Sequence, residues 1–239
     1  MSDPRDALSL IAHAALPTMG PLTSAQLDAL LAPLTPAPGR AALDIGGGRA
    51  DLAIALHDRL GLRVTSVDRS RIACEEGRLR IGARPIEIVE RDAATHIEHA
   101  RPTQLALAAC LGSTHALGGL TEAIAVLTAR LASAGALIVG DLVRLAAVDD
   151  EAFGDLPTPD DLARALTAHA LTERAHVQVS AAQLASYERH WRDTVEHHLA
   201  THPHHPAAAW AHARNTAMRD AARRGSLDHV AYLAVMATR

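Results

Sequence analysis

The sequence predicts an α/β fold with a doubly wound, mostly parallel sheet. Short apolar segments alternate with segments in which leucine recurs at helical spacing, as expected when each strand is followed by a crossover helix. Several of the expected strands end in an aspartate, and the carboxyl ends of the strands are where an open parallel sheet binds its ligand. The expected strands are the seven segments 41–45, 64–68, 86–93 including its exit, 104–110, 136–141, 173–180 and 229–238.

The chain is long enough for a substantial core, and we expect residues 1–239 to form a single domain. Prolines divide the N-terminal part into two helices, 7–16 and 24–32. A leucine pattern predicts a further helix from Leu120 through Leu131 that stops near Gly135. The expected parts are a helical leader at 1–37, a ligand-binding core at 38–141, a helical cap insertion at 142–206, and a last helix and strand at 207–239.

The composition argues against a nucleic-acid or membrane partner. The formal charge is −4, all 23 basic residues are arginine without a cluster, and only 2% of residues are aromatic, so a basic stripe with stacking platforms is lacking. No apolar run reaches the ~18 residues of a membrane span, and the first residues do not resemble a signal peptide. Two cysteines are too few for a disulfide framework. We therefore expect a cytoplasmic protein whose partner is a small molecule, and the oligomeric state stays open.

The most informative segment is the turn at residues 46–50, Gly-Gly-Gly-Arg-Ala. It follows the apolar strand 41–45 and precedes a helical leucine pattern. Glycine lets the backbone approach a ligand, and the free N–H groups at a helix start can bind it, so this unit is typical of a nucleotide-cofactor site. A dinucleotide fingerprint would place its third glycine at Asp51, so the spacing fits that fingerprint poorly.

A second landmark is Asp68, at the end of the strand 64–68. It lies about 20 residues beyond the last glycine, where a doubly wound fold places the carboxylate that binds ribose hydroxyls. A carboxylate that accepts from hydroxyl groups makes a charge-assisted contact. The alternative is that Asp68 caps the following helix, although Ser70 suits that role equally well. We favour ribose binding.

The segment Asp44-Ile45-Gly46-Gly47-Gly48-Arg49-Ala50 resembles motif I of class I S-adenosylmethionine (SAM) dependent methyltransferases, with alanine in place of the last glycine. The resemblance implies SAM as the cofactor and a last strand inserted antiparallel. It also implies that Asp44 lies near the methionine ammonium of SAM and that Asp92 and Ala93 contact its adenine. The residues expected at the cofactor are Asp44, Gly46, Gly47, Gly48, Asp68, Arg69, Asp92, Ala93, Cys110 and Leu111.

More of the chain is similar to a group of small bacterial class I methyltransferases, most of them without an assigned substrate. The similar segments are Pro21-Leu22-Thr23, the run 110–119, and Tyr187 and Trp191 followed by His202-Pro203. Those relatives usually have Gly-Glu-x-Tyr-Trp after the fifth strand, where this chain has Gly140-Asp141-Leu142-Val143-Arg144. The resemblance implies that the segment after Asp141 forms a lid or substrate cap.

Candidate residues for the acceptor side follow the fourth strand and lie in the cap. His115 is the candidate base, since it is placed to face the methyl group and an unperturbed histidine titrates near neutral pH. The alternative is a histidine that only bonds the backbone. Ser113 and Thr114 either orient the substrate or cap a helix. Tyr187 and Trp191, four residues apart on one helix face, either wall the substrate pocket or pack in the core.

Histidines crowd residues 190–212, and Asp193 with His197 has a spacing that can hold a metal ion. No HExxH motif or cysteine partner completes a site there, so we expect no metal and interpret the segment as a solvated, histidine-rich helix end and loop.

Three functions remain open. The first is SAM-dependent methyl transfer to an oxygen, nitrogen or carbon nucleophile of a small molecule. The second is a SAM-binding protein of the same fold that does not methylate, either as a regulatory module or with other SAM chemistry. The third is a NAD(P) oxidoreductase, which the glycine spacing opposes. We also expect the cap to be mobile and to carry substrate specificity.

Overall fold

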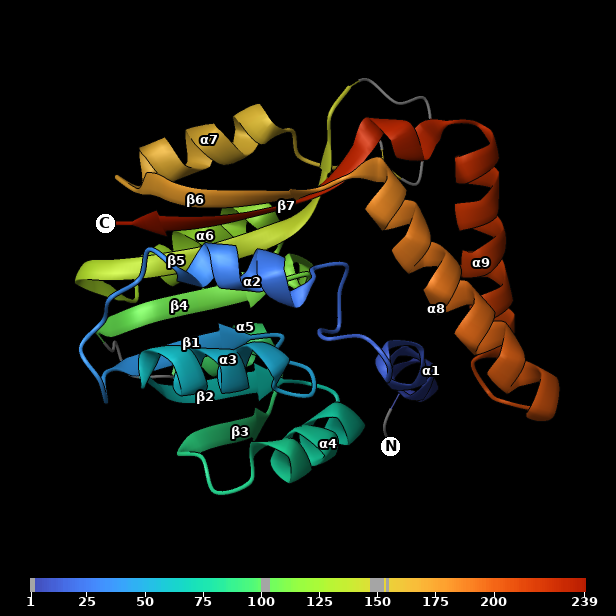
Figure 1. Ribbon diagram of the computed structural model, residues 1–239, viewed down its shortest axis with the longest axis horizontal. Coiled ribbons are helices and arrows are strands. Elements are labelled where there is room, and N and C mark those ends of the chain that lie inside the picture. The colour runs from blue at the N-terminus through green and yellow to red at the C-terminus, as the bar shows by residue number, and fades with distance from the viewer. Residues whose placement is uncertain (1–2, 100–103, 147–152, 154) are drawn as a thin grey trace.

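The computed structural model describes residues 3–99, 104–146, 153 and 155–239. Within these residues lies a seven-stranded sheet with the strand order β3-β2-β1-β4-β5-β7-β6 (Figure 1). Neighbouring strands from β3 to β5 pair in parallel, whereas β7 is inserted antiparallel between β5 and β6. The strands are β1 (Ala41–Ile45), β2 (Arg63–Asp68), β3 (Ile86–Glu90), β4 (Leu105–Leu111), β5 (Leu131–Arg144), β6 (Thr172–Val179) and β7 (Val230–Thr238). The predicted α/β class and mostly parallel sheet are confirmed.

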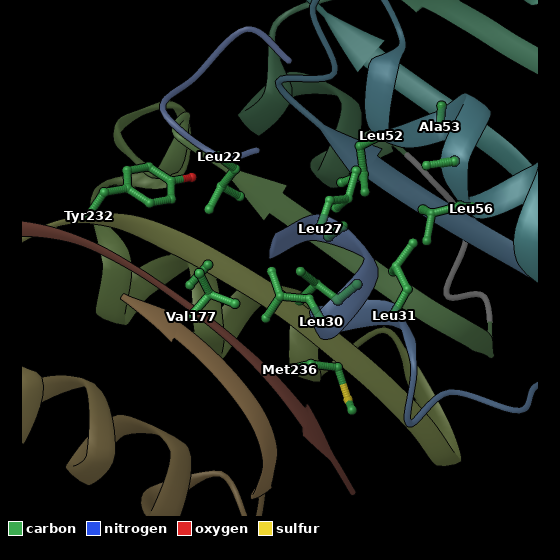
Figure 2. Packing of buried hydrophobic residues seen from close by; sticks show 14 of the residues in the cluster. Leu22, Leu27, Leu30, Leu31, Leu52, Ala53, Leu56, Val177, Tyr232 and Met236 are labelled. Atoms are coloured by element: carbon green, nitrogen blue, oxygen red, sulfur yellow. The ribbon is translucent and has the colours of Figure 1, made fainter. Parts of the chain in front are cut away.

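Helices cover both faces of the sheet, and each face has its own apolar core. On one face α2 and α3 bury Leu30 and Leu56 against Met236 of β7 and its neighbours (Figure 2). On the other face α5, α6 and α7 bury residues such as Ile124 and Leu137. The helices of these layers are α2 (Ser24–Leu31), α3 (Asp51–Leu60), α4 (Arg71–Ile81) beside β3, α5 (Ala93–His99), α6 (Leu120–Thr128) and α7 (Pro159–Ala168).

A third apolar cluster lies apart from these two cores and joins α1 (Pro4–His13), α8 (Ala181–Thr201) and α9 (Ala208–Arg223). In Figure 1 these helices stand beyond the carboxyl ends of the parallel strands. We call α1, α8 and α9 the cap. Its buried residues are Leu8, Ala12, Trp191, Val195, Leu199, Ala207 and Ala211. The cap thus combines one helix of the expected leader with two helices from the second half of the chain.

Local sequence signals account for several helix starts. Thr23 and Gln26 form a capping box at α2, in which each side chain accepts from the other residue's backbone N–H. At α8 the Ser180 hydroxyl accepts from the backbone N–H of Gln183 at 3.2 Å. Such caps fix where the helices begin, and the prediction therefore located α2 and α8 within a few residues.

The first helix, expected at 7–16, lies at Pro4–His13, and the predicted end of α6 and start of β5 are wrong. The helix expected to continue through Leu131 to near Gly135 ends at Thr128, and Leu131 instead begins β5, paired with Leu105 of β4. A four-residue leucine spacing suits a helix, but Leu131 reaches the core equally well from the sheet, where its backbone also finds a partner.

The expected cap segment 142–206 divides in the structure. Residues 142–144 complete β5, while α7 and β6 belong to the layers of the sheet, so that only α8 of this segment belongs to the cap as defined above. Residues 147–152 and 154 lie outside the described residues. No helix in the described ranges is both long and apolar enough to cross a membrane.

Candidate functional site

The loop between β1 and α3 requires glycine at two positions for different reasons. Gly46 has a φ of +67°, and its N–H donates to the carbonyl of Val67 at 2.8 Å. At Gly47 a Cβ would lie 1.9 Å from Ser66 Oγ and 2.6 Å from Asp44 Oδ2. The loop therefore passes directly over the ends of β1 and β2, where no side chain fits.

Ala50 occupies the place of the last motif glycine and still adopts the left-handed conformation, with a φ of +69°. This conformation costs a residue with a Cβ about 1–2 kcal/mol. The Ala50 methyl is fully buried against α4, where a Cβ built on Gly77 would lie 3.5 Å from it. The tight turn thus forms despite the departure from the motif.

Two carboxylates lie at the ends of adjacent strands beneath the loop. Asp44 is 2% exposed and accepts a hydrogen bond from Ser66 Oγ at 3.1 Å. Burial raises the pKa of Asp44 to about 7, and the neighbouring charge of Asp68 adds to this effect. Asp68 accepts from the backbone N–H groups of Gly48 and Ser70, both at 2.8 Å, and burial raises its pKa as well. Both carboxylates are therefore suited to a ligand that brings positive charge or hydroxyl groups.

These residues border a cavity of about 390 Å³, a volume typical of a small-molecule site. One end lies at the strand ends and is walled by the glycine loop, Asp44, Asp68 and Leu111. The other end is walled by the leader and the cap, with His13, Tyr187, Trp191, Trp210 and Arg214.

A second cavity of about 70 Å³ adjoins the first and shares Asp68 with it. Arg69, Asp92 and Ala93 also line this smaller cavity, so the structure brings together Asp68, expected at the ribose from its spacing, and the two residues that the resemblance assigns to the adenine. The Asp92 carboxylate caps α5 by accepting from the Thr95 backbone N–H at 3.0 Å, which lowers the pKa of Asp92.

The surroundings differ for Cys110 and Leu111 at the end of β4 and for Thr114 in the segment that follows. Leu111 lines the main cavity, whereas Cys110 is fully buried in the sheet and lines neither of the two cavities. Thr114 is also buried, and its hydroxyl donates to Asp141 Oδ2 at 2.6 Å. Neither Cys110 nor Thr114 therefore lines the two cavities, because Cys110 is buried in the sheet and the Thr114 hydroxyl is bonded to Asp141.

Ser113 and His115 lie at the wall between the two cavities. Ser113 packs on the glycine loop, where a Cβ added to Gly46 would lie 2.2 Å from Ser113 Cβ. Its side chain makes no capping hydrogen bond to the short helix η1 (Thr114–Leu117), so the capping alternative does not apply. His115 is exposed on η1 and borders both cavities.

Tyr187 of α8 is hydrogen-bonded to His13 of α1, with 2.8 Å between the Tyr187 hydroxyl oxygen and His13 Nε2. The carbonyl oxygen of Ser9 lies 2.6 Å from His13 Nδ1. Because a carbonyl can only accept, Nδ1 carries the proton and Nε2 accepts from the Tyr187 hydroxyl. Burial lowers the pKa of His13 to about 4 and raises that of Tyr187, so the pair is uncharged at neutral pH.

Trp191 belongs both to the cavity wall and to the apolar cluster of the cap, so both alternatives drawn from the sequence apply to it. Its ring meets Trp210 edge-on with 6.0 Å between centroids, and the Arg214 guanidinium lies 3.8 Å from its ring centre. The sequence analysis did not identify Trp210 or Arg214, because the alanine-rich helix α9 gives no pattern that marks a cavity face.

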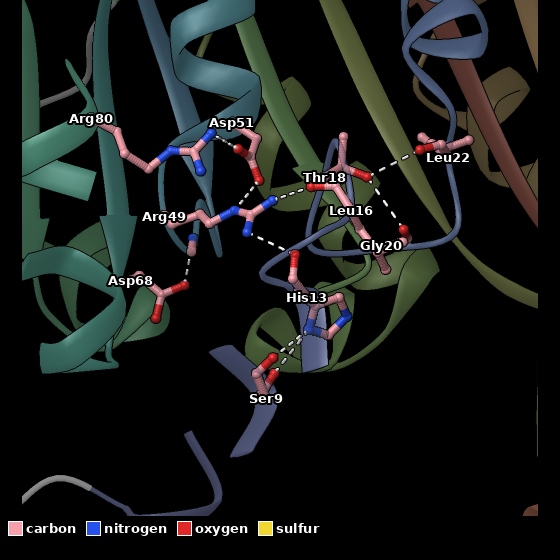
Figure 3. Close-up of polar contacts among 11 residues, drawn as sticks. Ser9, His13, Leu16, Thr18, Gly20, Leu22, Arg49, Asp51, Asp68 and Arg80 are labelled. Carbon is pink, nitrogen blue, oxygen red and sulfur yellow. Dashed lines mark hydrogen bonds and ion pairs between the residues drawn. The ribbon is translucent and has the colours of Figure 1, made fainter. Parts of the chain in front are cut away.

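Arg49 of the glycine loop attaches the leader to the sheet (Figure 3). Its guanidinium donates to the carbonyl of His13 at 2.7 Å and to that of Leu16, and its Nε pairs with Asp51 at 2.8 Å. Arg80 of α4 pairs with the other Asp51 oxygen at 2.6 Å. The loop that borders the cofactor end of the cavity therefore also holds the backbone of the cap helix α1 in place.

The histidines of the segment 190–212 lie on α8, on α9 and between them, and none of them lines either of the two cavities. His198 and His202 stack with 4.2 Å between ring centroids, and His205 meets His198 edge-on at 5.9 Å. Asp193 pairs with Arg192. In the part of the chain that the structure describes, no three histidine, cysteine or acidic side chains group as metal ligands would.

Solved structures share this architecture over the whole chain. YjhP from E. coli superimposes with a TM-score of 0.83 at 19% identity, over 97% of this chain and 99% of its own. A SAM-dependent methyltransferase from Thiobacillus denitrificans, solved with S-adenosylhomocysteine (SAH), gives a TM-score of 0.81 at 18% identity over 100% of both chains. The fold is that of the class I SAM-dependent methyltransferases.

The [4+2]-cyclase SpnF also shares the fold, with a TM-score of 0.67 at 17% identity over 98% of this chain and 80% of that chain. The sequence itself matches no protein-family model and no curated protein, so the likeness rests on structure. A common fold with low identity establishes the architecture, whereas the chemistry has to be argued from the site.

Proposed function

We propose that this chain is an enzyme that binds SAM and transfers its methyl group to a small-molecule acceptor. The main observation behind the proposal is that one cavity has two walls of different chemistry. One wall consists of the glycine loop with Asp44 and Asp68, and the other is an aromatic surface supplied by the cap. Two ligands can therefore meet in one cavity, as methyl transfer requires.

The residues of the sheet wall fit the parts of SAM. Gly46, Gly47 and Gly48 line the cavity, so that a ligand meets backbone and no side chain along this loop. Asp68 is placed to accept from the ribose hydroxyls, and Asp44 to face the methionine ammonium. Arg69, Asp92 and Ala93 then surround the adenine side in the adjoining cavity. When bound there, SAM supplies an activated methyl group on a sulfonium.

On the acceptor side, the protein has to orient the nucleophile, exclude water and take up a proton where the acceptor loses one. His115 is our candidate base, because it borders both cavities and is open to a ligand. The uncharged His13–Tyr187 pair presents a fixed hydroxyl at the acceptor end and is our candidate for orienting the acceptor. A cap built from α1, α8 and α9 covers this end and excludes water.

The base assignment has a direct test. His115→Ala should lower methyl transfer on the order of a hundredfold while leaving the dissociation constant of SAH unchanged. Turnover at the wild-type rate would rule out the role.

Cofactor binding is tested by calorimetry with SAH, which should bind with micromolar affinity, about −8 kcal/mol. Asp68→Asn keeps an oxygen that accepts from Gly48 or Ser70 and should weaken SAH binding by about 1.5–3 kcal/mol. The matched control is Asp58→Asn, in an exposed ion pair with Arg84, which should leave SAH affinity unchanged. Binding of NAD without binding of SAH would refute the proposal.

The alternative is a protein of this fold that holds SAM without methylating, and the likeness to a cyclase keeps it open. Labelled SAM incubated with the protein and a metabolite extract decides between them. Methyl transfer predicts that SAH and a labelled product accumulate in equal amounts, whereas retention of intact SAM favours the alternative.

A further inference from the structure

The two ends of the main cavity differ in charge. Asp44 and Asp68 lie at the strand ends and Asp51 at the start of α3, and Asp6 of α1 lies close enough for its charge to raise the pKa of Asp68. At the end formed by α8 and α9, Arg214 is the formally charged side chain among the described residues that line the cavity. The cofactor end therefore favours cationic groups, and the acceptor end favours an anionic one.

Arg214 has binding capacity that the protein itself does not use. One edge of its guanidinium pairs with Glu188, with 2.9 Å between Nη2 and Oε2, and its plane lies over Trp191. The other terminal nitrogen, Nη1, is buried and has no hydrogen-bond partner among the described residues. A guanidinium presents five donors in a planar fork that matches a carboxylate, so a second carboxylate can use the edge that Glu188 leaves free.

The aromatic residues of this chain are concentrated at the same place. The sequence contains two tryptophans and two tyrosines, and all four line this cavity. Tyr187 and Trp191 come from α8, Trp210 from α9 and Tyr232 from β7. Because only 2% of the residues are aromatic, this concentration provides flat apolar surfaces where a ring of the ligand can lie.

We propose that the methyl acceptor is an aromatic carboxylate, whose carboxylate binds Arg214 and whose ring lies among Tyr187, Trp191 and Trp210. This inference rests on the proposed function, because only methyl transfer makes the bound carboxylate an acceptor. Binding of the carboxylate can be measured without any methyl transfer. A phosphate ester fits less well, since a dianion would meet a single guanidinium whose neighbour Glu188 is itself negative.

The intrinsic fluorescence of the protein reports this site directly, because both tryptophans line it. Benzoate, 4-hydroxybenzoate, cinnamate and indole-3-acetate are titrated beside their neutral amides, with and without saturating SAH. Phenyl phosphate and cyclohexanecarboxylate test the charge and the ring separately. At least one aromatic acid should quench with an affinity tenfold or more above that of its amide, and should exceed both other probes.

Arg214→Gln should remove the preference for acid over amide, and Arg214→Lys should retain part of it. The matched control is Arg219→Gln, an exposed position on the same helix that does not line the cavity. Thermal melting of each variant shows whether it is folded. A merely structural Arg214 would lower the melting temperature without changing the ratio of acid to amide affinity.

Equal affinity for acids and amides, no binding by any member of the series, or tighter binding of phenyl phosphate would each overturn the proposal. The two failures can be told apart. Loss of acid preference with intact SAH binding removes only the carboxylate assignment. A protein that prefers aromatic acids through Arg214 but does not bind SAH would keep this site and lose the methyltransferase proposal.

Discussion

The two walls of the cavity are held in place by different interactions. The sheet wall rests on strands covered on both faces, with Ile45, Leu107 and Ile138 fully buried. The cap has its own small cluster, and it meets the core of the sheet through single buried residues, Leu184 of α8 and Ala221 of α9, and through polar contacts such as that of Arg49 with the leader. The residues proposed for the cofactor therefore lie on the wall with the larger core, and we expect the wall that carries the residues proposed for the acceptor to open at lower free energy.

The largest effect is expected from breaking the Arg49 contacts. Arg49→Met leaves two carbonyls and one side of Asp51 without their partner, and should lower the free energy of unfolding by about 3–5 kcal/mol. Hydrogen exchange should increase most in α1. The control Arg84→Met removes an exposed pair with Asp58 and should change the free energy of unfolding much less, because solvent screens such a pair. Equal effects of the two variants would contradict the difference between the walls.

Truncating the centre of the cap cluster should have the next largest effect. Trp191→Ala should cost about 3 kcal/mol, since it removes a buried ring packed on Trp210 and Arg214. If the cap is a separate cooperative unit, exchange should rise in α8 and α9 and stay unchanged in β1 and β4. Acceptor binding should also weaken more than SAH binding. A uniform rise across the sheet would show that both walls unfold together.

The last prediction concerns how the stability of the protein and its affinity for SAH change with pH through the carboxyl group of Asp44. Because the pKa of Asp44 is about 7 in the folded protein and 3.8 when the side chain is solvated in the unfolded chain, folding favours its neutral form. The stability gained is present below pH 3.8 and is lost as the pH rises through about 7.

Binding of an ammonium beside Asp44 requires the ionised form, so SAH affinity should change in the opposite sense. It should fall by up to about tenfold, or 1.4 kcal/mol, for each pH unit below 7. Calorimetry from pH 5.5 to pH 8, a range of about 2.5 units around that pKa, should show this slope in the wild type and a flat profile in Asp44→Asn. A flat profile in both would mean that the ammonium does not bind at Asp44.

The difference between the walls also explains which parts could be predicted from sequence. Asp44, the glycine loop and Asp68 are fixed by strand ends and a turn close together in the chain, so local patterns were sufficient to place them in one cavity. The fold class followed from the same alternation. The contact between His13 and Tyr187 joins residues 174 positions apart, which no spacing rule reveals.

Other misses have equally specific causes. Arg214 and Trp210 lie on a helix whose alanines suit any apolar neighbour, so the sequence did not indicate which face meets the cavity. Successive side chains of a strand point to opposite faces, so Cys110 of β4 is buried in the sheet core whereas the next residue, Leu111, lines the cavity. Thr114 was expected at the substrate, but Asp141 on β5 accepts its hydroxyl instead.

The composition of the cap from both halves of the chain has a consequence for synthesis. The ribosome makes the glycine loop, Asp68 and Ser113 well before Trp210 and Arg214, which follow later in the sequence. A nascent protein therefore carries the residues proposed for the cofactor long before it can enclose a second ligand. A product truncated before α9 would contain the whole glycine motif and still lack Trp210 and Arg214 of the far wall, so the presence of the motif in a fragment is no measure of a finished site.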